Sequence, residues 1–253
     1  MADLREFFYD DYDNDDDGAK GGLSIHCNPL RTRLVPLLPR PFRQSARRAG
    51  ATHALGFGLL LTFSSSIGQT YFIALFAGAL RADLDLSHGA FGGLYTLATL
   101  ASALILVWLG KTADRVDPVV LAALTLASLA GSALLLAGAE SVLWLGVGLF
   151  GLRLFGQGMS SHLAMTFVAR WFVRERGRAL GRVFLGYPAG EAVFPMLMAL
   201  LLGLFTWRWI WVGIAIAVVL ILMPAMLWMG RGMRRHGLVD MPAQIPTQSA
   251  TQS

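Results

Sequence analysis

Three ionisable residues stand inside otherwise apolar stretches of this sequence: Arg153, His162 and Glu191. Hydrocarbon penalises charge, so ionisable side chains within membrane spans face the bundle interior or an aqueous pocket and mark functional sites. Counted along α-helices, His162 and Glu191 lie roughly 12–14 Å from the same membrane surface. An imidazole beside a carboxyl can change charge near neutral pH. The two residues therefore predict a proton-coupling pair between spans four and five, with a fixed interhelical hydrogen bond as the alternative.

Arg153 predicts a different site. It lies nine residues before His162, which is half a turn net of α-helix, so the two should face opposite sides of one span. Gln157 and Ser160 follow Arg153 at i+4 and i+7, on one helical face. Similar polar stripes occur in two earlier apolar stretches, with Phe72 and Phe76 continuing the first. We expect a cavity for a small polar or anionic solute, with helix packing as the alternative for the hydroxyl groups; its candidate residues are Ser65, Gln69, Tyr95, Thr99, Arg153 and Gln157.

The composition indicates that these residues are positioned by membrane helices. Of 253 residues, 55% are hydrophobic and 15% charged, and the mean hydropathy is +0.56, whereas soluble domains carry about 25% charged residues. The single cysteine, Cys27, excludes a disulfide framework. Six apolar stretches have the length of about 20 residues that a membrane-spanning helix needs. They predict an all-α membrane protein with spans at about 54–79, 90–109, 119–137, 142–168, 183–205 and 209–229.

The segments outside the spans are polar. Residues 1–53 form an acidic and then basic tail that cannot build a core, residues 54–230 form the six-helix bundle, and residues 231–253 begin a linker. The sixth span is apolar around its circumference and contains Pro224, which predicts a kinked helix facing lipid.

Basic residues near the span ends predict the orientation. Fifteen Lys and Arg residues fall on one side, and two, Arg81 and Arg208, on the other. Both termini should therefore be cytoplasmic, in a multi-pass protein of a cell membrane, with a bacterial inner membrane as the expected location. The lipid bilayer and a small solute are the expected partners. Nucleic acid is not, because no aromatic and basic recognition module is present.

Three segments resemble the major facilitator superfamily across residues 54–230. Gly110-Lys111-Thr112-Ala113-Asp114-Arg115 is similar to the family's loop between helices two and three, and Arg153-x-x-Gly156-x-Gly158 to its helix-four motif. The following loop contains Arg170-Trp171-Phe172 and Arg176-Gly177-Arg178. The resemblance implies a secondary transporter, such as a symporter, in which two six-helix bundles rock about a central site. It also implies a cytoplasmic gate at Gly110, Asp114, Arg115, Arg170 and Arg178.

The family has twelve helices, so six imply an amino-terminal half that works with a carboxy-terminal half, or a half-transporter that forms a homodimer. We expect no enzymatic activity, cofactor or metal. An intramembrane serine protease built on Ser160 is the best enzymatic alternative, but no histidine lies in another span to act as its base. The run Asp13-x-Asp15-x-Asp17-Gly18 begins like a calcium loop, yet Ser24 replaces the required glutamate.

Cys27, the only native thiol, tests this topology. An impermeant maleimide should label it in permeabilised cells and leave it unlabelled in intact cells, because the tail should be cytoplasmic. Labelling of intact cells would reverse the orientation.

Overall fold

The computed structural model describes residues 40–114, 116–172 and 175–235. The bundle lies within the unit that begins at residue 50. Its described part is helical and contains no strand, so the predicted all-α class is confirmed. Five helices are long and apolar enough to cross a membrane, and a bent pair makes a sixth span if its two parts are counted together.

The first span is broken, whereas the sequence predicted a continuous helix over 54–79. Helix α2 (Arg40–Ser65) leads through a 3-10 turn, η3 (Ser66–Gly68), to Gln69, whose backbone is extended. The short helices α3 (Thr70–Ala74) and α4 (Ala77–Asp83) follow, and α4 is bent by 64° from the segment Gly50–Ala74 before it. The break at Gln69 places irregular backbone in the middle of an apolar span, which membranes tolerate where protein or a cavity covers it.

Local capping chemistry starts the next two spans. Helix α5 (His88–Leu109) begins at Ser87, whose hydroxyl accepts a hydrogen bond from the Ala90 amide, and the 3-10 turn η4 (Gly110–Asp114) follows it. Helix α6 (Pro118–Ala137) begins at Asp117, whose carboxylate accepts from the amides of Val119 and Val120. Proline at the first helical position favours the same start.

The fourth span changes its winding in the middle. Helix α7 (Val142–Gly151) passes into a π-helical segment, η5 (Leu152–Ser160), and then into α8 (Ser161–Trp171). The Ser160 hydroxyl, which is fully buried, donates to the Phe155 carbonyl five residues earlier, as π-helical winding allows. Ser160 is thus turned to its own helix, away from the polar stripe that the sequence predicted. The same contact argues against a nucleophilic role.

The last two spans are α9 (Arg176–Phe184) with α10 (Gly186–Leu204), and α11 (Trp207–Ala217) with η6 (Val218–Leu222) and α12 (Met223–Arg235). The π-helical turn η6 ends two residues before Pro224. A proline ring clashes with the carbonyl four residues earlier and lacks the amide hydrogen, so regular α-helical hydrogen bonding cannot continue here. The kink predicted from Pro224 thus takes the form of a change in winding.

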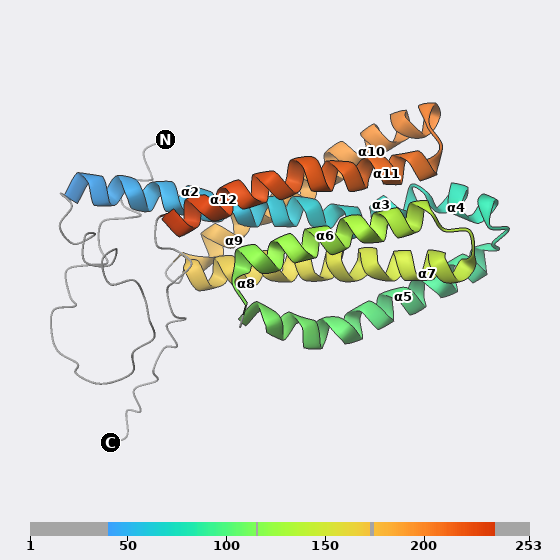
Figure 1. Cartoon of the computed structure of the whole chain (residues 1–253), viewed down its shortest axis with the longest axis horizontal. Coiled ribbons are helices and arrows are strands. Elements are labelled where there is room, and N and C mark those ends of the chain that lie inside the picture. The colour runs from blue at the N-terminus through green and yellow to red at the C-terminus, as the bar shows by residue number, and fades with distance from the viewer. Residues whose placement is uncertain (1–39, 115, 173–174, 236–253) are drawn as a thin grey trace, which may run out of the picture. The chain divides into compact units, whose positions relative to one another are not determined.

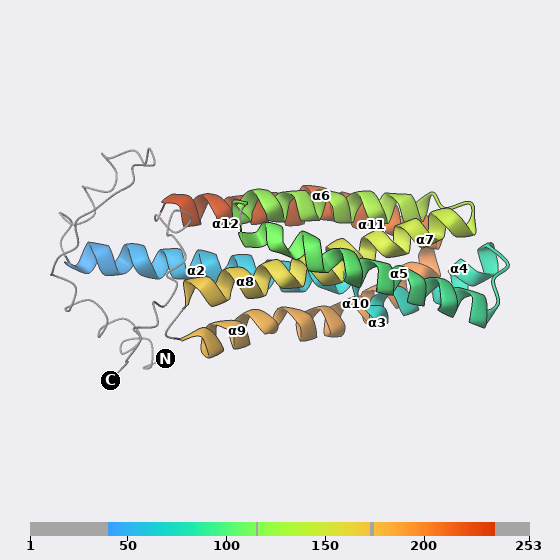
Figure 2. The same ribbon diagram turned by 90° about the horizontal axis from the view of Figure 1, so that it is seen from below.

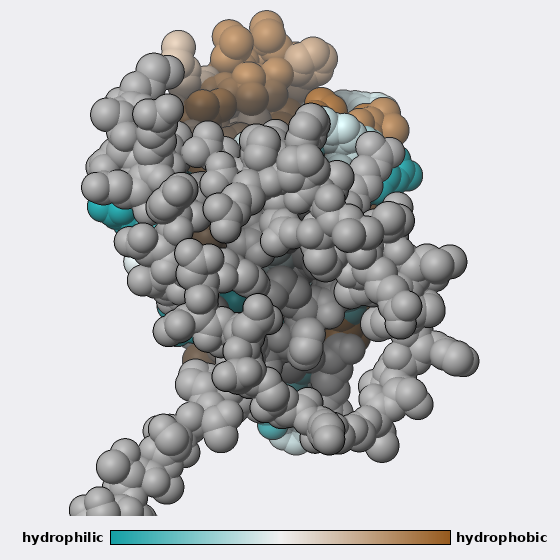
Figure 3. Space-filling view, turned by 90° about the vertical axis from the view of Figure 1, so that its left-hand side faces the viewer, coloured by the Kyte–Doolittle hydropathy of each residue, from teal (hydrophilic) through white to brown (hydrophobic). Residues whose placement is uncertain are grey.

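Helix α6 lies between the fourth span and the sixth (Figure 1) and is the most buried of the five continuous spans, with 56% of its most apolar stretch covered. The spans containing α5 and α10 are covered least, at 11% and 17%. Figure 3 shows hydrophobic surface at its top, the side on which α10 lies in Figure 1. Exposed apolar residues of α10 include Val193, Met196, Leu200 and Leu204. These two spans offer the largest apolar faces to lipid or to further helices.

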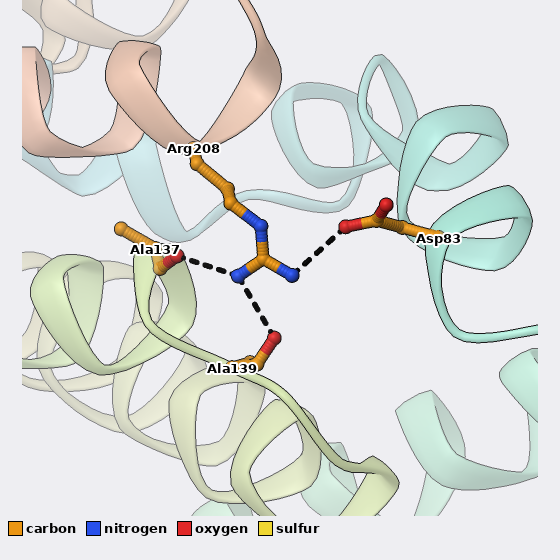
Figure 4. Close-up of polar contacts among 4 residues, drawn as sticks. All are labelled: Asp83, Ala137, Ala139 and Arg208. Atoms are coloured by element: carbon orange, nitrogen blue, oxygen red, sulfur yellow. Dashed lines mark hydrogen bonds and ion pairs between the residues drawn. The ribbon is translucent and has the colours of Figure 1, made fainter.

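Arg208 ties together the loops at the end that the sequence places outside the cell. It lies just inside α11, donates to the carbonyls of Ala137 and Ala139 at 2.9 Å each, and pairs with the Asp83 carboxylate at 2.8 Å (Figure 4). Its guanidinium also lies over the Trp207 ring, 4.5 Å from the centroid. One side chain therefore connects the ends of spans one, three and six.

Gly68 permits the close crossing of spans one and four. A Cβ at this position would overlap the Leu152 carbonyl oxygen and stand 2.8 Å from the Gly156 Cα. These neighbours are backbone atoms, so they cannot move aside as a flexible side chain would.

We expect Gly68→Ala to destabilise the bundle by about 1–3 kcal/mol, the usual cost of overpacking, and to lower the thermal denaturation midpoint of the detergent-purified protein. Gly78→Ala is the matched control, because nothing lies within 4 Å of a Cβ there. Equal midpoints for the two variants would contradict the crossing.

Candidate functional site

The Arg153 guanidinium reaches across to the break in the first span. Its Nη1 donates to the Gly68 carbonyl at 3.1 Å and to the Thr70 hydroxyl at 3.3 Å, so it bonds to both sides of the extended residue Gln69. The side chain is 9% exposed. A carbonyl freed by a helix break needs a donor in a membrane, and Arg153 supplies one. The arginine thus holds the irregular turn against span four.

Tyr95 from span two completes this cluster. Its ring lies under the guanidinium, 5.4 Å from centroid to Cζ, and its hydroxyl hydrogen-bonds to the Thr70 hydroxyl at 2.9 Å. The sequence predicted Tyr95 and Arg153 as cavity residues, and the structure brings them together. Gly68 and Thr70 were missed, although a glycine beside a polar pair in an apolar span is a signal for a broken helix.

Arg153 has no carboxylate partner among the described residues, where the ion pairs lie elsewhere. Its Nε is buried and makes no hydrogen bond there. Gln157 Oε1 and Thr99 Oγ1, two further candidates, are also buried without a hydrogen-bond partner in that part of the chain. Buried polar atoms normally have partners, so such a group of unpaired atoms indicates a place for water or a ligand.

The stripe predicted on span one does not face this site. The Ser65 hydroxyl is fully buried and donates to the Thr62 carbonyl in its own helix. Phe72 and Phe76 pack on Trp211 of the sixth span, at centroid distances of 5.6 and 5.0 Å. The helix break turns the residues after it, so the α-helical period did not carry across. Gln69, the extended residue, is half-buried beside the Arg153 contacts.

His162 lies on the same side of span four as Arg153, contrary to the prediction. Its Nε2 lies 3.2 Å from the Gly110 carbonyl at the end of α5, the helix that also carries Tyr95. The intervening segment is π-helical, so nine residues complete roughly two turns and return to the same face. Both residues therefore line the boundary between spans two and four.

The structure does not form the predicted His162–Glu191 pair, since no ion pair between them occurs in the described part of the chain. Glu191 is exposed on α10. Its neighbour Gly190 packs so closely on span one that a Cβ there would overlap the Ser66 hydroxyl. The two ionisable residues thus face different neighbours, and a coupling role for Glu191 stays a prediction.

Two of the residues predicted for the gate contact span four or its neighbour. Arg170 Nη1 donates to the Ala113 carbonyl at 3.2 Å, and Gly110 packs on the His162 ring, so span four holds the loop after span two from two points. Figure 2 shows the ribbons of α8 and α5 in this region. Arg178 pairs with Glu175 at 3.7 Å within its own turn. Asp114 ends η4, but its side chain and all of Arg115 lie outside the described residues.

Asp117 adds a contact that the sequence did not predict. Besides capping α6, it pairs with Arg234 at 2.9 Å, connecting the loop after span two to the end of the sixth span. Gly230 allows α12 to pack closely on the start of α6, because a Cβ there would stand 2.5 Å from Val119 Cγ1.

These features define a multi-pass helical membrane protein whose buried polar cluster lies at a broken helix. A comparison with protein-family models matches the Major Facilitator Superfamily over residues 58–250. The chain belongs to this superfamily and is a membrane transporter. Searches of curated proteins and of solved structures found no match.

Separate variants resolve the two roles of Asp117. Asp117→Asn should keep the helix cap and lose the ion pair, at a cost below about 1 kcal/mol for a partly exposed pair. Asp117→Ala should cost about 1 kcal/mol more, because it also removes the cap. Thermal denaturation measures both.

Arg234→Gln is the control and should match Asp117→Asn. If Asp117→Ala proved no less stable than Asp117→Asn, the capping role would be wrong.

Proposed function

We propose that the chain is the amino-terminal six-helix half of a secondary active transporter that moves a small anionic solute by alternating access. The observation that carries this proposal is the Arg153 guanidinium, which is buried in a membrane bundle and has no carboxylate partner among the described residues. An arginine at the centre of a bilayer costs about 2.5–3.5 kcal/mol even on the lenient insertion scale. A solute anion would offset this cost.

Arg153 suits this role because a guanidinium presents a fixed fork of donors to a carboxylate or oxyanion. Nη1 is engaged with Gly68 and Thr70, which fixes the orientation of the group. Tyr95 covers one face of it. Gln69, Thr99 and Gln157 supply further polar groups from three spans. Ser65, which the sequence also proposed, faces its own helix and has no part in this site.

In this proposal further helices complete the site. Spans two and five present the largest apolar faces, so we propose that a carboxy-terminal six-helix half or a second copy of the chain packs there. The loop containing Gly110 and Asp114, together with Arg115, Arg170 and Arg178, would act as the cytoplasmic gate. In this proposal the protein lies in a bacterial inner membrane with both termini in the cytoplasm.

Anion binding to the purified protein tests the proposal. Sulfate, phosphate, acetate and succinate would be added in turn, with glucose as the uncharged comparison, and the denaturation midpoint recorded. At least one anion should stabilise the wild type, by about 2.7 kcal/mol at one hundred times its dissociation constant. Arg153→Gln should clearly reduce this stabilisation, and Arg153→Lys should retain more of it than Arg153→Gln.

Arg182→Gln is the matched control, because Arg182 is an exposed arginine of α9. Stabilisation of Arg153→Gln equal to that of the wild type would place the anion elsewhere. Stabilisation by glucose alone would point to a neutral solute.

A further inference from the structure

A second space, lined by both apolar and basic side chains, lies closer to the end of the bundle that the sequence places in the cytoplasm. A cavity of about 340 Å³ opens between spans two and four, within the size range of small-molecule pockets. Two basic side chains and one hydroxyl line it, and none of its described lining residues is acidic. The lining residues are Ala103, Leu106, Val107, Gly110, Lys111, His162 and Thr166.

The His162 hydrogen bond assigns the role of each ring nitrogen. A backbone carbonyl only accepts hydrogen bonds, so Nε2, 3.2 Å from the Gly110 oxygen, carries the hydrogen. Nδ1 is therefore the nitrogen that can gain a proton. A proton gained there would give the cavity a second positive charge beside Lys111.

The described charged side chains near His162 are basic. Lys111 lies on η4 and is exposed, and Arg170 on α8 itself donates to the Ala113 carbonyl. No acidic residue of the described chain forms an ion pair with His162. Asp114 belongs to η4, but its side chain lies outside the described residues.

Buried polar atoms occur on spans two and four between the Arg153 level and this cavity. Spans two and four run in the same direction, because three close contacts along them join residues that are 52 positions apart in the sequence. The pairs are Leu94 with Gly146, Leu106 with Gly158, and Gly110 with His162. Thr99 lies four residues after Tyr95 in span two, and Gln157 lies four residues after Arg153 in span four. Ser161 comes one turn later, and its hydroxyl is buried without a partner among the described residues, as are Thr99 Oγ1 and Gln157 Oε1. Such atoms require water or a ligand.

We propose that Lys111, His162 and Thr166 form a second site for a small anion on the cytoplasmic side, where anion binding is coupled to proton uptake on His162 Nδ1. The inference rests on the proposed function, since the site would hold the solute between Arg153 and the cytosol. A bound anion favours the charged imidazole, so affinity rises as pH falls and is lost as pH rises. The proton comes from solvent and returns to it when the anion leaves.

Sulfate binding at two pH values tests the site, because sulfate does not titrate in this range. Calorimetry on the full chain in detergent, at about pH 5.5 and 7.5, should show affinity about fivefold tighter at the lower pH, the upper range for a partly exposed charge pair. His162→Gln should remove the pH dependence, since glutamine can still donate to Gly110 but cannot gain a proton. Lys111→Gln should weaken binding at both pH values, and Lys111→Arg should restore it.

His88→Gln, at the exposed start of α5, is the matched control and should behave as the wild type. Equal affinity at both pH values, an unchanged pH dependence in His162→Gln, or no saturable sulfate binding would overturn the site. If Arg153→Gln abolished all binding, a single site at Arg153 would replace it. If Arg153→Gln left binding unchanged while Lys111 and His162 variants lost it, the second site would stand and the proposed function would fail.

Discussion

A buried positive charge beside a broken helix is the constraint on which the rest of this bundle depends. Arg153 bonds to the Gly68 carbonyl and to Thr70 on either side of the break. The break can approach span four because Gly68 and Gly156 meet without side chains. Arginine and irregular backbone are each costly in hydrocarbon, but together they satisfy part of each other's hydrogen bonding. No carboxylate of the described residues neutralises the charge itself.

The π-helical segment of span four decides which residues share a surface. Its wider winding returns Arg153 and His162 to the side of span two. Regular α-helix would have directed His162 toward another neighbour, as the sequence-based prediction assumed. Segments of this kind are often found at functional sites. Here the segment places the Arg153 cluster and the cavity beside His162 along one boundary between spans two and four.

The sequence predicted the fold well because hydrocarbon imposes a simple rule on span length and composition. The apolar stretches around α5, α6 and α10 needed no tertiary information, and the importance of Arg153 followed from its charge alone. The partners of the polar residues were predicted less well. Ser65 and Ser160 turn to their own helices, and His162 bonds to Gly110 instead of pairing with Glu191. The face assigned to His162 was wrong because a regular α-helical period was carried across the π-helical segment. Ser65 instead bonds back to its own helix, as serine side chains in helices can.

A structure of the transporter in a lipid bilayer at a resolution that shows bound ions tests the central claim most directly. The account predicts density for a bound anion within hydrogen-bonding distance of the Arg153 guanidinium. An Arg153 side chain directed into the acyl chains, or paired with an acidic residue of this chain, would contradict it.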